Sequence, residues 1–161
     1  MTEVPRIKKL EVVGPLSLRA IFKDGTEVDA DLSGLCARSR HFKVFRDDPE
    51  AFAQAHLIHN GSGIAWPNGL DYGADALLSL ALWQQEMSGR EFKAWQRRVQ
   101  LSNNEAADLL GVSLTTVKNY HGRDVVPAAV KIACDAFEHN PTLLYGRFKV
   151  RERGRPKAKV A

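Results

Sequence analysis

The first part of the chain alternates hydrophobic and polar residues with the two-residue period of β-strands. Residues 7–13 alternate loosely, and residues 16–22 and 27–32 do so more regularly. The Asp24-Gly25 pair between the last two segments favours a tight hairpin turn, because glycine tolerates a positive φ. The pattern therefore predicts three strands, of which the last two form a hairpin.

A second group of short elements follows these strands. Asp48-Pro49 is typical of a helix start, with Asp48 as the N-cap and proline in the first turn. Residues 55–59 and 64–66 are expected to be strands on either side of a polar, glycine-containing turn at 60–63. Together these elements predict a small α+β unit built on an antiparallel sheet.

From residue 74 onward the hydrophobic spacing becomes that of helices. Residues 74–87 predict one helix, and Ser88-Gly89 is interpreted as its end and as a domain boundary. Residues 90–99 predict an amphipathic helix with apolar positions at Phe92, Trp95 and Val99. The inner face of the 74–87 helix is expected to carry Leu77, Leu78, Ala81 and Leu82.

Two further short helices have clear start and stop signals. Ser102 and Glu105 form a capping box that predicts a helix over residues 103–110, which Gly111 ends. A tight turn then leads into a predicted helix over residues 114–121. Two short helices joined in this way are typical of a helix-turn-helix unit, whose second helix enters the major groove of DNA.

The outward side of the 114–121 helix carries the candidate base-reading residues. Asn119 would pair with adenine and Lys118 with guanine or a phosphate, because the major-groove edges of these bases offer matching donors and acceptors. The full predicted set is Leu114, Thr115, Lys118 and Asn119.

The run from Phe92 to Tyr120, with its Ala-Ala-Asp-Leu-Leu-Gly-Val-Ser core, resembles the Cro and phage-repressor type of helix-turn-helix. Residues 126–134 resemble the fourth helix of that family. The resemblance implies a compact helical bundle that binds DNA as a homodimer. The chain departs from the family at His121, where an acidic residue is common, and in a shorter loop after Tyr120. Expected phosphate contacts, the first implied by the resemblance, are Asn103, Ser113, Thr116 and Arg123.

The N-terminal part has a resemblance of its own. The Phe22-Lys-Asp-Gly25 run, Asp48-Pro49 with Phe52, and above all the run from Trp66 to Asp71 (Trp-Pro-Asn-Gly-Leu-Asp) resemble a bacterial family known only as a domain of unknown function. The resemblance covers most of residues 6–78 and implies a fold but no activity.

The positive charge is concentrated at the C-terminal end. Residues 1–88 carry a net charge of −3, residues 89–146 +1 and residues 147–161 +6, which together give the chain's +4. Such a tail is typical of attraction to DNA phosphates, and a solvated tail that aids solubility is an equal alternative. The Arg-Gly-Arg-Pro run at 153–156 resembles the core of an AT-hook. This resemblance implies minor-groove or flanking contacts from Arg153, Arg155 and Lys157.

The sequence contains no matched set of catalytic or metal-binding residues. Cys36 and Cys134 lack a metal-ligand spacing. Asp29 and Asp31 are more simply exposed strand residues, and Trp66 and Trp83 are expected in the core. We therefore expect no enzyme activity, cofactor or metal. No segment has the pattern of a signal peptide or a membrane span, which favours a cytoplasmic protein.

These observations predict an α+β protein in three parts: an α+β domain at 1–88, a helix-turn-helix domain at 89–146 and a disordered basic tail at 147–161. The expected function is sequence-specific DNA binding by a bacterial or phage transcriptional regulator, a homodimeric repressor. The open alternative is an antitoxin-like module. In that alternative the N-terminal domain binds a partner protein, and the helix-turn-helix serves autoregulation.

Overall fold

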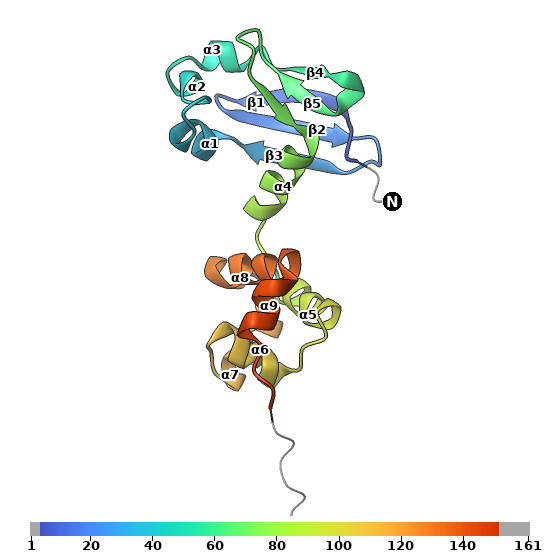
Figure 1. Ribbon diagram of the computed structural model, residues 1–161, viewed down its shortest axis with the longest axis vertical. Helices are drawn as coiled ribbons and strands as arrows, with labels where there is room; N and C mark the ends of the chain where they lie inside the picture. The colour runs from blue at the N-terminus through green and yellow to red at the C-terminus, as the bar shows by residue number, and fades with distance from the viewer. Residues whose placement is uncertain (1–3, 152–161) are drawn as a thin grey trace, which may run out of the picture. The chain divides into compact units, whose positions relative to one another are not determined.

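The computed structural model describes residues 4–151 (Figure 1). The chain divides between Gln85 and Glu86 into two compact units, each with its own hydrophobic core. Short antiparallel sheets in the first unit are followed by helices in the second, so the predicted α+β class is confirmed. No helix within the described residues is both long enough and apolar enough to cross a membrane.

The first sheet of the N-terminal unit forms as predicted. Strands β1 (Ile7–Gly14), β2 (Ser17–Phe22) and β3 (Glu27–Asp31) are antiparallel in the order β1-β2-β3. In the β2–β3 turn, Asp24 Oδ1 accepts a hydrogen bond from the Thr26 N–H at 2.9 Å, and Gly25 has a φ of +91°. The alternating residues Leu18, Ala20, Phe22, Val28 and Ala30 are buried.

The second sheet is larger than predicted. Strands β4 (His56–Ile58) and β5 (Gly63–Ala65) pair as expected, and β6 (Asp71–Gly73) adds a third antiparallel strand that the pattern did not predict. The turn between β4 and β5 contains the short 3-10 helix η1 (His59–Gly61). All three η1 residues have positive φ angles, so this turn is conformationally demanding.

Four helices complete the N-terminal unit. Helix α3 (Pro49–Phe52) begins as predicted, with Asp48 accepting the Ala51 N–H at 2.9 Å. Helices α1 (Ser33–Arg38) and α2 (Val44–Asp47) were not predicted from the pattern.

The fourth helix of the unit, α4 (Ala74–Gln84), is shorter than its prediction. It buries Leu77 and Ala81, but Leu82 is 42% exposed, so the predicted inner position of Leu82 was wrong. Residues 85–87, which were predicted to belong to this helix, do not extend α4. Ser88, which was interpreted as a stop signal, is instead the N-cap of the following helix.

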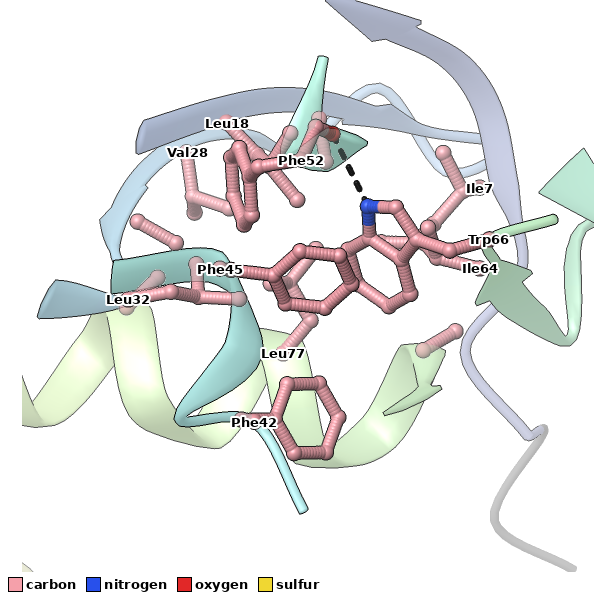
Figure 2. Packing of buried hydrophobic residues seen from close by; sticks show 14 of the residues in the cluster. Ile7, Leu18, Val28, Leu32, Phe42, Phe45, Phe52, Ile64, Trp66 and Leu77 are labelled. Atoms are coloured by element: carbon pink, nitrogen blue, oxygen red, sulfur yellow. Dashed lines mark hydrogen bonds between the residues drawn. The ribbon is translucent and has the colours of Figure 1, made fainter. Parts of the chain in front are cut away.

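Aromatic rings form the centre of the N-terminal core (Figure 2). The ring centroid of Trp66 lies 5.0 Å from that of Phe45 and 5.7 Å from that of Phe52. The Trp66 indole N–H donates to the Phe52 carbonyl oxygen at 2.8 Å, so the one polar atom of this ring is satisfied inside the core. Trp66 is therefore a core residue as predicted, whereas Trp83 is 56% exposed and its core assignment was wrong.

The C-terminal unit consists of helices α5 (Gly89–Arg98), α6 (Asn103–Leu110), α7 (Leu114–His121), α8 (Ala128–His139) and α9 (Pro141–Arg147). The bounds of α6 and α7 match those predicted from their caps. The Trp95 indole N–H donates to the Cys134 carbonyl oxygen at 3.0 Å and so joins α5 to α8. The buried centre includes Phe92, Trp95, Ala106, Val117, Tyr120 and Cys134.

The first residues of the predicted tail, 147–151, contact the helical unit. Arg147 ends α9, which the pattern did not predict, and Phe148 packs against the core. Arg151 donates two hydrogen bonds, of 2.6 and 2.8 Å, to the Asp108 carboxylate on α6. The expectation of a disordered segment from Arg147 was therefore wrong for residues 147–151. Arg153, Arg155 and Lys157 lie outside the described residues.

Candidate nucleic-acid interface

Local hydrogen bonds fix the path of the chain from α6 into α7. The Ser102 N–H donates to Glu105 Oε2 at 2.7 Å, and the Glu105 N–H donates to Ser102 Oγ at 3.2 Å, which is the predicted capping box. Gly111 has a φ of +69°, so the left-handed position expected at the end of α6 is occupied by glycine. The Val112 N–H then donates to the Ala107 carbonyl oxygen at 3.0 Å.

The N-terminus of α7 is capped by its own side chains. Ser113 Oγ accepts the Thr116 N–H at 3.1 Å and lies 2.8 Å from the Thr116 hydroxyl oxygen. Ser113 and Thr116, both predicted to contact phosphates, are thus engaged with each other. Each hydroxyl still has hydrogen-bonding capacity beyond this contact.

One side of α7 is free of core contacts. Val117 and Tyr120 are buried in the helical unit, and these two positions turn the opposite side of the helix outward. Leu114 is 36% exposed there, the lowest value among the exposed large hydrophobic residues of the described chain. The predicted base-reading set therefore gathers on one exposed surface, which we call the α7 face: Leu114, Thr115, Lys118 and Asn119.

A buried amide connects the helices behind this surface. Gln96 on α5 is only 5% exposed, and its Nε2 donates to Asn103 Oδ1 at 3.1 Å. Its Oε1 accepts a hydrogen bond from His121 Nε2. Sequence reasoning missed Gln96, although a polar residue four positions after Phe92, on the apolar side of the helix, was a signal of a buried polar contact.

The surroundings of His121 disfavour the charged form of its imidazole. Partial burial lowers the pKa of His121, and the charge of Lys93 lowers it further. Since Gln96 offers His121 a carbonyl oxygen, the neutral ring carries its proton on Nε2.

An open pocket of about 240 Å³ adjoins this hydrogen-bonded chain, at the edges of α5, α6 and α7. It is several times larger than the roughly 30 Å³ that one water occupies. Its lining is mostly polar and consists of Lys93, Gln96, Arg97, Leu101, Asn103 and His121.

Most acidic side chains of the helical unit are already paired. Glu91 and Glu105 close capping boxes, and Asp108, Asp135 and Glu138 form ion pairs with Arg151, Lys131 and Arg98. Arg123 stacks over the Tyr120 ring, with Cζ 5.8 Å from the centroid. Seven cations have no ion-pair partner in the part of the chain from residue 86 to residue 151: Arg90, Lys93, Arg97, Lys118, Arg123, Arg147 and Lys149.

The lowered pKa of His121 predicts a pH dependence of stability. In the unfolded chain this imidazole binds a proton near its ordinary pKa, whereas the folded unit resists protonation at the same pH. The helical unit should therefore lose stability as the pH falls from about 7 to about 5.5. The loss can be measured from the urea dependence of the Trp95 indole N–H resonance at each pH.

The matched variant for this pH series is His121→Gln. Its amide nitrogen can still donate to Gln96, but it does not titrate in this range. In this variant the free energy of unfolding should vary less with pH above about pH 5.5, where the carboxylates of the unit are still ionised. An equally steep loss in His121→Gln would assign the effect to another group.

Comparison with known proteins identifies part of the chain. Residues 7–82 match the model of a family described as a protein of unknown function, DUF2442. The matched residues lie in the N-terminal unit, where the sequence pattern had indicated a resemblance to a domain of unknown function. No curated protein matches the chain.

One solved structure, from Nitrosomonas europaea, is similar over most of the chain. It is named a "putative DNA binding protein" and shares 27% sequence identity. The similarity covers 86% of this chain and 90% of the other, with a TM-score of 0.46.

Proposed function

We propose that the protein is a sequence-specific DNA-binding regulator of transcription, in which α6 and α7 act as a helix-turn-helix of the Cro and phage-repressor type. The observation that carries the proposal is the α7 face. It lies on a helix with a capped N-terminus, and its four exposed residues include Lys118 and Asn119. A helix of this kind fits the major groove, where amide and ammonium groups read base edges.

The charge pattern supports the same proposal. Cations without ion-pair partners in residues 86–151 are available to DNA phosphates, and each phosphate contact adds to salt-dependent affinity. Among the predicted phosphate contacts, Asn103 and Arg123 remain in the proposal with the hydroxyls of Ser113 and Thr116. Arg153, Arg155 and Lys157 would add contacts from the tail, whose beginning is attached to α6 through Arg151.

In this proposal the protein acts as a homodimeric repressor, and the N-terminal unit serves oligomerisation or senses a partner. Selection of bound duplexes from a random pool tests the core of the proposal. A palindromic site with half-sites about one helical turn apart is the expected result for a dimer. The absence of any enriched sequence at low salt would reject sequence-specific binding.

Asn119→Ala should relax the preference at one base position of the selected site and leave the fold intact. The expected loss is about 1–3 kcal/mol on the preferred base and little on the others. Arg123→Ala is the contrasting variant, because loss of a phosphate contact weakens binding to all sequences alike. Titration of both variants against single-base variants of the site separates the two effects. A uniform loss in Asn119→Ala would contradict its base-reading role.

A further inference from the structure

The hydrogen bonds beside the pocket run in one direction. Gln96 Oε1 can only accept, so His121 Nε2 is the donor to it. Gln96 Nε2 in turn donates to Asn103 Oδ1 at 3.1 Å. The Asn103 Nδ2 group has no hydrogen-bond partner within residues 4–151. Each donor therefore fixes the orientation of the next amide, and the chain ends on an unused NH₂ group of a residue that lines the pocket.

The composition of the pocket selects the kind of ligand. Lys93 and Arg97 have no ion-pair partner among the described residues, and neither of the pocket's amides nor its imidazole adds negative charge. The carboxylate of Glu105 is turned back on the Ser102 N–H. Two cations and a directed NH₂ group favour an anion with several acceptor oxygens, and a phosphodiester is such a group.

We propose that His121 and Gln96 are positioning residues, which keep the Asn103 NH₂ group directed at the backbone phosphate that Asn103 contacts in the proposed function, and that this phosphate lies in the pocket beside Lys93 and Arg97. The proposal rests on the proposed function and deepens it. Lys93 and Arg97 supply the charge, whereas Asn103 supplies a directional hydrogen bond that sets how α6 meets the backbone. Gln96 itself does not touch the DNA.

A double-mutant cycle in the full chain tests the positioning role. Gln96→Met keeps the volume of the buried side chain and removes both hydrogen bonds, and Asn103→Ala removes the group that they orient. Each single variant should bind the selected duplex about tenfold more weakly. The double variant should bind no more weakly than Asn103→Ala, because both changes remove one contact.

A conservative substitution separates positioning from folding. His121→Gln retains a donor for Gln96 and should retain wild-type affinity, whereas His121→Leu should lose about as much affinity as Gln96→Met. The Trp95 indole N–H resonance shows at each step that the helical unit is folded. Loss of affinity in both His121 variants would overturn the positioning role of His121 and Gln96.

Duplexes with single neutral methylphosphonate linkages locate the phosphate. The wild type and Asn103→Ala should bind equally to the duplex whose neutral linkage replaces the phosphate that Asn103 contacts, because the charge of that phosphate is already absent. Arg97→Gln should reduce the slope of log affinity against log salt by about one. Gln96→Met should leave that slope unchanged.

Two further results would overturn the phosphate pocket and the positioning role of His121 and Gln96. One is additive losses of affinity in the Gln96→Met, Asn103→Ala cycle. The other is an Asn103→Ala loss that persists on every modified duplex. Failure of the wild-type chain to bind any duplex at low salt would instead overturn the proposed function.

Discussion

Gly89→Ala is expected to destabilise the helical unit strongly and, in the proposed function, to weaken DNA binding. Gly89 is the buried first residue of α5. A Cβ at this position would overlap the carbonyl oxygen of Tyr120 and lie 2.6 Å from that of His121. Because both obstacles are backbone atoms at the end of α7, relief requires the two helices to separate. We expect a loss of about 3 kcal/mol.

The matched control for this change lies on the other side of the same contact. Gly122 follows α7, has a φ of −100°, and a Cβ there would meet nothing within 4 Å. Gly122→Ala should therefore retain DNA affinity and a wild-type urea midpoint for the Trp95 indole N–H resonance. A Gly89→Ala variant that behaves like this control would contradict the close approach of α5 to α7.

Gly61→Ala should have a comparable or larger effect on the N-terminal unit. Gly61 is buried in the η1 turn, with a φ of +82°, which side chains rarely adopt. A Cβ there would also overlap the carbonyl oxygen of Ile7 on β1 and lie 2.9 Å from its carbonyl carbon. Backbone strain and the steric overlap add, so we expect a loss of about 4 kcal/mol.

The Trp66 indole N–H resonance reports this loss, because Trp66 lies in the N-terminal core. Gly34→Ala is the control, since Gly34 lies in α1 and a Cβ there would meet nothing within 4 Å. The control should be neutral or stabilise α1 slightly, because alanine is the better helix former. Retention of the wild-type Trp66 signal in Gly61→Ala would show that β1 and η1 can move apart at little cost.

Local signals explain which elements were predicted from the sequence. The β2–β3 turn and the start of α6 depend on side chains within three residues of the backbone groups that they satisfy, Asp24 and Ser102 among them. The N-cap residues of α1 and α2 make no side-chain cap, although Asp31 Oδ1 accepts the Ser33 N–H at 2.8 Å, and each helix is shorter than two turns. They are held by burial of Cys36 and Phe45, which depends on distant parts of the chain.

The candidate site shows the same limit. Outward positions on α7 follow from helical periodicity once Val117 is placed in the core. The contact of Gln96 with Asn103 and His121 joins three helices, and no local pattern specifies which polar atoms meet across them. His121 stands where the resemblance implies an acidic residue, so the sequence marks this position as a departure from the family. Its partner became visible only with the packing of α5 against α7.

The pairing of Arg151 with Asp108 alters how C-terminal truncations should be interpreted. Besides its hydrogen bonds to Asp108, Arg151 interacts electrostatically with Glu105 one turn earlier on α6. Its guanidinium therefore screens two carboxylates on a helix that, in the proposed function, approaches a polyanion. A deletion that begins at Arg151 removes this screening together with the basic residues that follow. A deletion that begins at Glu152 leaves the Arg151 guanidinium beside these carboxylates. The difference in DNA affinity between the two deletions therefore measures the repulsion between the α6 carboxylates and the DNA.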